Sequence, residues 1–204
     1  IVVLVLAEVD KCVKTKLSDI AIINMGQSPS SNDVNENGEG LVFFQGKAEF
    51  GKIYPLAKKY CTSPKKIANK NDILLSIRAP VGPTNIATQE TAIGRGLTAI
   101  RALQSPDSKY LFHYFRFIEP WLSKQGTGST FKAISGQFVK NLPVLLPPLA
   151  EQKEIATRLD KLLAQVESIN VRLEKVSGVI KRVRQSVLEA AVSGELTEEL
   201  ANKS

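Results

Sequence analysis

Apolar positions in the last third of the chain recur at alternating steps of four and three residues. The series comprises Ile155, Leu159, Leu162, Val166, Ile169, Leu173, Val176, Ile180, Val183 and Val187. Such spacing is typical of a coiled-coil seam, and polar or charged residues fill most of the positions between. A helix over 155–187 is roughly 50 Å long, whereas a head of about 140 residues is only about 30–40 Å across. The seam therefore predicts pairing with another helix, and packing along the chain's own head is the alternative.

Proline and glycine mark the ends of this helix. Pro147 and Pro148 precede it, and proline is tolerated in the first turn of a helix. Ser193-Gly194 provides a glycine stop at the other end. Ser177-Gly178 interrupts good helix formers, and glycine costs about 1 kcal/mol there. We therefore expect a kink or a short break at this point, with the seam in phase on both sides.

The chain before the prolines has the pattern of short strands and one helix. Runs of β-type residues bounded by glycine, proline and asparagine predict strands at 41–46, 72–77 and 92–100. The aromatic and aliphatic spacing of residues 108–125 is closer to that of a helix. Two polar loops rich in Gly, Ser, Thr and Asn cover 25–40 and 124–136. Long loops in compact domains are usually functional or disordered.

These patterns together predict an α+β fold class. We expect a strand-rich mixed head over residues 1–144 and a C-terminal coiled-coil helical region over residues 145–204. A length of 204 residues is enough for one domain with an appendage and a real hydrophobic core.

The net charge of +7 is confined to the head. Residues 1–142 hold 18 Lys and Arg against 11 Asp and Glu, whereas residues 143–204 hold nine of each. A basic head favours a polyanionic partner, nucleic acid first. A merely solvated basic surface would give the same count, so charge alone leaves both interpretations open.

The sequence contains none of the catalytic motifs tested. It has neither a GxxxxGK[ST] phosphate loop nor a GxSxG elbow. The Leu-Pro-Pro-Leu stretch at 146–149 lacks the polar and aromatic residues that adenine methyltransferases place around a proline pair. The single histidine, His113, lies in an aromatic helical run, where a satisfied or half-buried imidazole is the ordinary outcome.

Metal and membrane sites are not expected either. Two cysteines and one histidine are too few for a four-ligand zinc site, and Cys12 and Cys61 are predicted to be free thiols in a reducing cytoplasm. The apolar run 1–7 is much shorter than a membrane span of about 20 residues. A buried strand is the expected state of this run, and a trimmed signal segment is the alternative.

The remaining candidate chemistry is a surface that reads DNA. Arg and Lys can pair with guanine, Gln and Asn can pair with adenine, and glycine lets the backbone approach closely. The residues predicted to bind DNA are polar or basic and lie in loops or at strand ends: Gln27, Ser28, Ser30, Gln45, Lys47, Arg78, Arg95, Thr127, Ser129, Thr130 and Lys132.

The sequence resembles the specificity (S) subunit of type I restriction-modification enzymes. The tail "LPVLLPPLAEQKEIATRLDKLLAQ" with "RQSVLEAAVSGELT" is similar to that family's conserved helical region, over roughly residues 142–200. Residues 16–31, 71–82 and 127–144 resemble, more weakly, its target recognition domain.

The resemblance implies a non-catalytic subunit that reads one half of a bipartite double-stranded DNA site. A whole S subunit has two recognition domains and two helices that pair antiparallel and space the half-sites. This chain has one of each, so the resemblance implies a second copy or an absent second half. The helix-pairing residues would then be Leu159, Leu162, Val166, Ile169, Leu173, Val176, Ile180 and Val183. Residues 147–149 and 151–152 would orient the helix.

Cofactors and catalysis would belong to partner subunits. The methyltransferase (M) subunit of the family binds S-adenosylmethionine, and the restriction (R) subunit uses ATP and Mg. No cofactor, metal or membrane is expected for this chain, and the expected location is the cytoplasm.

Two other classes of function remain as alternatives. One is a protein-interaction coiled-coil module without DNA specificity. The other is an enzyme, a methyltransferase or nuclease with a divergent site, for which binding of S-adenosylmethionine would be the sign.

Overall fold

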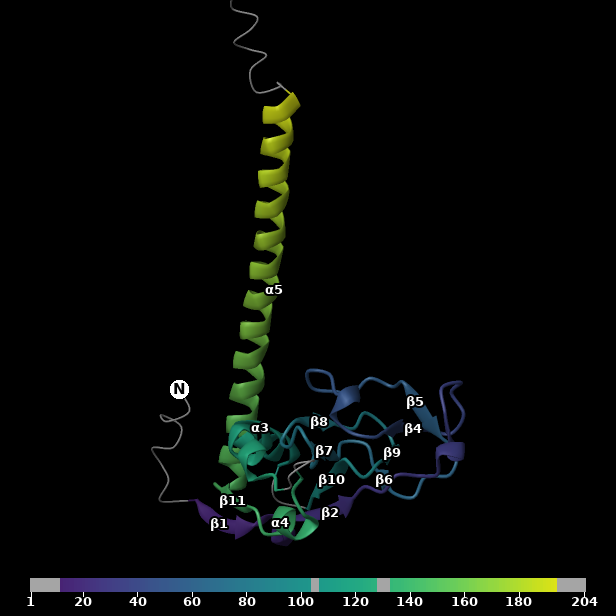
Figure 1. Cartoon of the computed structure of the whole chain (residues 1–204). Coiled ribbons are helices and arrows are strands. Elements are labelled where there is room, and N and C mark those ends of the chain that lie inside the picture. Colours follow the sequence, from purple (N-terminus) through teal and green to yellow (C-terminus); the bar gives the residue numbers. More distant parts are fainter. Residues whose placement is uncertain (1–11, 104–106, 128–132, 194–204) are drawn as a thin grey trace, which may run out of the picture. The chain divides into compact units, whose positions relative to one another are not determined.

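The computed structural model describes residues 12–103, 107–127 and 133–193. Its packing divides the chain into two compact units, Ile1–Ala156 and Thr157–Ser204. Figure 1 shows the strands and short helices of the first unit and the single long helix, α5. The domain boundary predicted between residues 144 and 145 stays a prediction. The apolar run 1–7 lies outside the described residues.

The centre of the first unit is an antiparallel four-stranded sheet in the order β2-β10-β7-β8. Its strands are β2 (Ala21–Met25), β10 (Leu97–Ala102), β7 (Ile73–Ser76) and β8 (Thr84–Ile86). Every residue of β7 is buried. Because side chains alternate between faces, an unbroken apolar run such as Ile73-Leu74-Leu75 indicates a strand covered on both sides.

A second sheet has the order β3-β5-β4-β9-β6. Its strands are β3 (Val34–Asn35), β5 (Lys59–Cys61), β4 (Leu41–Phe44), β9 (Thr91–Ile93) and β6 (Ile67–Ala68). The β4–β9 pair is parallel and the other pairs are antiparallel. The predicted strands at 41–46 and 72–77 are confirmed as β4 and β7.

The predicted strand at 92–100 is wrong as a single element. The chain turns at Gly94-Arg95-Gly96, where the Leu97 N–H donates to the Gly94 carbonyl at 3.0 Å. β9 therefore pairs in the second sheet and β10 in the first. Both glycines lie against Gln45: a Cβ on Gly94 would be 2.6 Å from its side-chain oxygen, and a Cβ on Gly96 would be 2.5 Å from its carbonyl oxygen.

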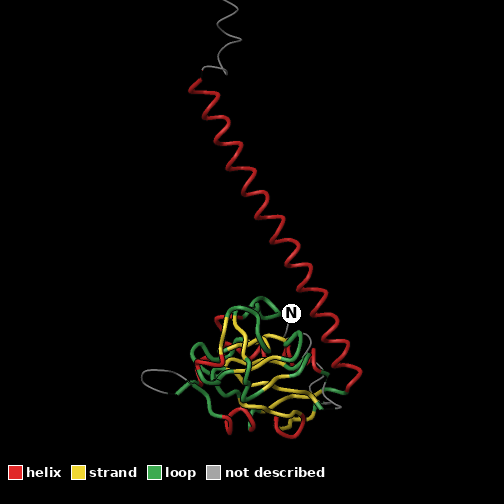
Figure 2. Tube along the Cα trace, turned by 90° about the vertical axis from the view of Figure 1, so that its right-hand side faces the viewer, coloured by secondary structure: helices red, strands yellow, loops and turns green. Residues whose placement is uncertain are grey.

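The two larger hydrophobic cores lie on opposite faces of the four-stranded sheet. Ile73 and Leu75 belong to one core, which also contains Leu111 and Phe115 of helix α3 (Ser108–Gln125). Leu74 belongs to the other core, with Val42, Phe44 and Ile93 of the second sheet. The helix predicted at 108–125 is confirmed, and Figure 2 shows the strands gathered in the compact unit.

The described short helices are α2 (Leu17–Ile20), α4 (Gly136–Lys140), and the 3-10 turns η2 (Ser31–Asp33) and η3 (Lys47–Glu49). A further antiparallel pair joins β1 (Val13–Lys16) to β11 (Pro143–Leu146). The hydroxyls of Tyr110 and Tyr114 in α3 donate to the carbonyls of Leu145 and Pro143 in β11.

Gln152 holds in place the first turn of α5 (Leu149–Ser193), which belongs to the first unit. Its side chain is 1% exposed. Its Nε2 donates to the Pro147 carbonyl at 2.8 Å, and its Oε1 accepts from the Asp107 N–H at 2.9 Å. Asp107 is also the N-cap of α3. The role expected for the Pro-Pro-Leu-x-Glu-Gln turn, to orient the helix, stays a prediction.

Helix α5 continues through Ser177-Gly178, so the predicted break is wrong. Propagating a helix past one glycine is cheaper than nucleating a second one, because nucleation fixes several residues for one hydrogen bond. Ser193 is the last described residue of the helix, and the predicted stop at Gly194 lies outside the described residues. Seam side chains from Leu162 to Val187 are 45 to 62% exposed. Among the described helices, none is both long and apolar enough to cross a membrane.

Candidate nucleic-acid interface

Backbone hydrogen bonds bring several predicted DNA-binding residues to one end of the two sheets. The Gln27 N–H donates to the Ile93 carbonyl at 3.0 Å. Gly94 and Gly96 donate to the carbonyls of Phe44 and Gln45, at 2.8 and 3.2 Å. The segments that carry Gln27, Gln45 and Arg95 are therefore neighbours although they are far apart in sequence.

Glycine is required where these segments meet. A Cβ on Gly26 would lie 2.2 Å from the Gly94 carbonyl oxygen. A Cβ on Gly96 would lie 2.5 Å from the Gln45 carbonyl oxygen. Real Cβ atoms do not approach backbone so closely, so any side chain here would push the segments apart.

Ser28 and Gln45 form the centre of this end. Gln45 Nε2 donates to Ser28 Oγ at 2.9 Å, and the same hydroxyl lies 3.3 Å from Gln45 Oε1. The Arg95 N–H also donates to Ser28 Oγ, at 3.3 Å. Gln45 and Ser28 are half-buried, whereas the Arg95 side chain is exposed. A positioned amide, with an exposed arginine on the neighbouring segment, provides both donors and acceptors for base edges.

Arg78 and Thr127 continue the same hydrogen-bonded edge. The Ile77 N–H donates to the Gly96 carbonyl at 2.9 Å, and the Ile134 N–H donates to the Ile77 carbonyl at 3.0 Å. Arg78 and Thr127 each form a β-bridge with Ala133. Both side chains are exposed.

The other predicted residues are less closely connected. Ser30 precedes η2 and Lys47 begins η3, and both are exposed. Ser129, Thr130 and Lys132 lie outside the described residues. For all eleven residues, contact with DNA stays a prediction.

The structure adds Lys59 and Lys66 to this end of the sheets. Lys59 lies opposite Phe43 in the β4–β5 pair, and both line an open hollow of about 420 Å³ together with Gln45, Asn35 and Ser31. The carbonyl of Lys66 accepts from the Ile93 N–H at 3.0 Å, beside the Gln27 contact. The sequence carried a signal for these residues: residues 47–70 contain seven lysines and one acidic residue, Glu49.

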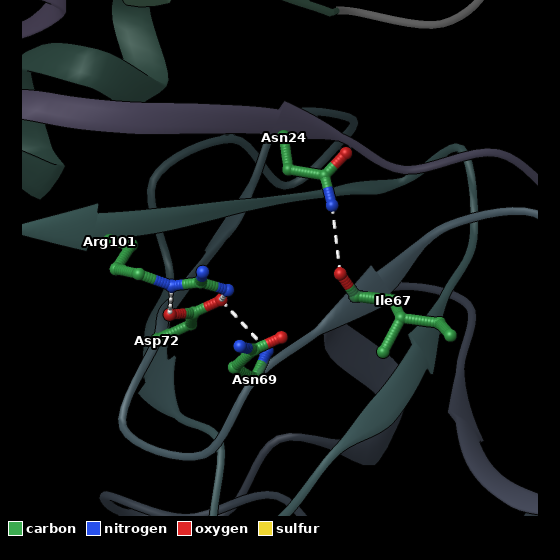
Figure 3. Close-up of polar contacts among 5 residues, drawn as sticks. All are labelled: Asn24, Ile67, Asn69, Asp72 and Arg101. Atoms are coloured by element: carbon green, nitrogen blue, oxygen red, sulfur yellow. Dashed lines mark hydrogen bonds and ion pairs between the residues drawn. The ribbon is translucent and has the colours of Figure 1, made fainter.

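An ion pair supports the strands at the start of β7. Arg101 Nε and Nη2 donate to the two carboxylate oxygens of Asp72, at 2.8 and 2.9 Å. The Asn69 N–H donates to the same carboxylate at 2.8 Å. Hydrogen bonding to Asp72 raises the pKa of Arg101 above its ordinary value. Figure 3 shows this cluster, with Asn24 of β2 bonded to the Ile67 carbonyl of β6.

The described part of the interface provides donors, acceptors and positive charge. Within residues 12–103, 107–127 and 133–193, no group of three His, Cys, Asp or Glu side chains could hold a metal ion. His113 is 8% exposed and lies edge-on to Phe112 in α3. The arrangement is suited to binding a polar, anionic partner through its surface.

Comparisons with known proteins agree on one family. Residues 10–177 match the family described as "Type I restriction modification DNA specificity domain". The chain is 40% identical over 171 residues to the putative type I restriction enzyme MjaX specificity subunit of Methanocaldococcus jannaschii, covering 83% of this chain and 40% of that protein.

Solved structures give the same result. The crystal structure of the HsdS subunit from Thermoanaerobacter tengcongensis has a TM-score of 0.76 and 39% identity, over 89% of this chain and 44% of that one. A chain from a study of complex assembly and conformational transition of the type I R-M system has a TM-score of 0.83 and 40% identity, over 89% and 45%.

The chain thus spans less than half the length of these relatives. Its mixed sheets and long helix have the same fold as theirs, and the family match covers most of its residues. The chain belongs to the family of type I restriction modification DNA specificity domains.

Proposed function

We propose that this chain is a DNA sequence-recognition module of a type I restriction-modification specificity subunit, and that it reads one half of a bipartite site. The observation that carries the proposal is the edge of neighbouring segments that holds Gln27, Ser28, Gln45, Arg78 and Arg95, in a chain of this family. Family membership does not favour the alternative of an interaction module without DNA specificity.

In this proposal the half-buried amide of Gln45 reads a base edge. Gln pairs in two places with adenine, and Arg pairs in the same way with guanine. Arg78 and Arg95 are the exposed guanidinium groups on the same edge. Lys47, Lys59 and Lys66 would neutralise backbone phosphates, which fixes the register of the duplex without reading its sequence.

Partner subunits would supply the chemistry. We propose that a methyltransferase subunit brings S-adenosylmethionine, and that a restriction subunit brings ATP and Mg. The module itself would have no catalytic role. The exposed seam of α5 would pair antiparallel with a second S half, or with another copy of this chain, because a stripe of apolar side chains is stabilised by burial.

The test is a binding-site selection. The whole chain, with its methyltransferase partner present, is incubated with a library of random duplexes, and the bound fraction is sequenced. We expect enrichment of one short motif and an affinity that falls steeply with salt, because each neutralised phosphate releases counterions. Binding without any sequence preference would overturn the proposal.

Charge reversal separates DNA reading from a general charge effect. Arg78→Glu and Arg95→Glu should each weaken binding of the selected duplex by about fivefold to 150-fold, since one bidentate base contact is worth about 1–3 kcal/mol. Lys14→Glu makes the same charge change on the exposed side of β1, away from the interface, and should have a small effect. Equal losses of affinity in all three variants would mean that the protein binds the duplex through its overall charge and does not read its sequence.

A further inference from the structure

The loop of residues 51–56 presents apolar side chains to solvent, and we call it the tip loop. Ile53, Tyr54 and Leu56 are 40, 53 and 62% exposed. Monomeric proteins rarely expose such side chains together without a binding role. None of these three residues takes part in the interface described above.

The tip loop is held rigidly. The Gly51 N–H donates to the Tyr54 carbonyl at 3.1 Å, and the Leu56 N–H donates to the Glu49 carbonyl at 2.8 Å. Asn85 of β8 is 1% exposed, and its side-chain amide makes two hydrogen bonds to Gly51. Its Oδ1 accepts from the Gly51 N–H and its Nδ2 donates to the Gly51 carbonyl, both at 3.1 Å. A rigid loop loses little conformational freedom when it binds.

Positive charge surrounds the tip loop. Lys52 and Lys58 flank its apolar side chains in sequence, and both are exposed. A hollow of about 180 Å³ beside Gly51 is lined by Lys47, Lys52 and Arg116, with Glu119 as its one acidic side chain. This excess of cations fits the backbone of a nucleic acid better than an average protein surface.

The tip loop is also continuous with the candidate interface. Lys47 lines the hollow and follows Gln45 by two residues. Pro83 and Thr84 line the hollow too. Both contact the end of β7 that leads to Arg78: Thr84 pairs with Leu75, and the Pro83 carbonyl accepts from the Ser76 N–H. A duplex that lies along Gln45 and Arg78 would therefore pass the tip loop.

We propose that the tip loop is a second DNA contact, which enters the minor groove next to the recognised half-site. Tyr54 and Leu56 press against base steps there, and Lys47, Lys52 and Lys58 contact the flanking phosphates. Proteins that bind the minor groove commonly insert apolar side chains between base steps and use Lys or Arg beside them. This inference rests on the proposed DNA-recognition function and extends the footprint of the same surface.

The test uses the double variant Tyr54→Ser/Leu56→Ser in the whole chain, which removes apolar surface and leaves the charge unchanged. Affinity for the selected duplex is measured by fluorescence anisotropy at several salt concentrations. We expect a loss of about tenfold with an unchanged salt dependence. Lys52→Gln/Lys58→Gln should instead reduce the slope of log K against log salt by about 2, because two phosphate contacts are lost.

A base analogue reports the groove contact directly. 2-Aminopurine placed beside the half-site should brighten when the parent protein binds and unstacks it, and this change should be lost in the Tyr54→Ser/Leu56→Ser variant. Ile22→Ser, at a side chain of β2 that is 52% exposed, is the matched control and should behave as the parent. Circular dichroism and Tm establish that each variant is folded.

The opposite result is equally clear. If the Tyr54→Ser/Leu56→Ser variant binds the duplex as the parent does, the tip loop is not a DNA contact. A simultaneous loss of binding to the methyltransferase subunit would assign it to a protein partner instead. If the parent binds duplexes without sequence preference, the proposed function fails, while the comparison on one fixed duplex still decides the role of the tip loop. A parent that binds no duplex overturns both.

Discussion

The two side chains of the Arg101–Asp72 ion pair differ in their exposure to solvent. The Asp72 side chain is 3% exposed and that of Arg101 is 42% exposed. The carboxylate is therefore the group that depends on its partner, since a guanidinium at the surface can return to water. Removing Arg101 takes away two of the hydrogen bonds to the Asp72 carboxylate and leaves the one from the Asn69 N–H.

We expect Arg101→Ala to lower the free energy of unfolding by about 2–3 kcal/mol, less than for a fully buried pair because Arg101 is half exposed. Urea denaturation of the whole chain measures this. Lys14→Ala, at another exposed cation, should change stability by less than about 0.5 kcal/mol. An equally small change for Arg101→Ala would mean that the ion pair adds nothing to stability.

Tyr110 gives the fold a dependence on alkaline pH. Burial, with weaker effects of Cys12 and Tyr114, raises the pKa of Tyr110 to about 12 from an ordinary value of 10.0. The folded state thus holds this phenolic proton more tightly than the unfolded state. Its contribution to stability is complete below pH 10 and is lost as the pH rises toward 12.

Tyr110→Phe should therefore reduce stability at pH 7 by about 1 kcal/mol, the worth of its hydrogen bond to the Leu145 carbonyl. The decline of the free energy of unfolding between pH 10 and pH 12 should become shallower. Urea denaturation across this range measures both, with Tyr54→Phe at an exposed side chain as the control. An unchanged slope would contradict the assignment to Tyr110.

At the scale of elements, α5 combines an anchored first turn with an exposed seam. Gln152 satisfies the Pro147 carbonyl and the Asp107 N–H at the base of the helix. The seam side chains from Leu162 to Val187 remain 45 to 62% exposed. An apolar stripe of this length is stabilised when a second helix covers it, which is why we propose pairing there.

Leu162→Asp and Ile169→Asp should each disrupt this pairing, because a charge in an apolar seam costs several kcal/mol. Sedimentation of the whole chain, with its second half or as a homodimer, measures the assembly state. Val171→Asp places the same charge at a 40% exposed valine about 200° around the helix from Ile169, and should leave assembly intact. An assembly state unchanged by the two seam variants would mean that the seam is not the pairing surface.

At the scale of the whole molecule, the net positive charge and the polar groups of the candidate interface both lie before the long helix. All of the net positive charge lies before residue 143, and residues 47–70 hold seven of the lysines. Gln27, Ser28, Gln45 and Arg95 supply polar groups at the end of the sheets. This distribution of residues fits the proposal that lysines position a duplex and that a few other side chains read its sequence.

The sequence by itself determined the elements whose periodicity is strong. The helix at 108–125 and the start of α5 follow from apolar spacing and from the proline pair before α5, which act on neighbouring residues. The family resemblance also rested on local motifs and is confirmed. Local signals misplaced the strand at 92–100 and the break at Ser177-Gly178, because a sheet partner and helix cooperativity decide these points.

Only the tertiary structure decided which distant residues meet. Gln27, Gln45, Arg78 and Arg95 are neighbours because strands from two sheets end together and glycines let their backbones approach to hydrogen-bonding distance. The pairing of Arg101 with Asp72, and the addition of Lys59 and Lys66 to the interface, depend on sheet register in the same way. Register is set by which faces are buried, and that is a property of the packed molecule, beyond any single stretch of sequence.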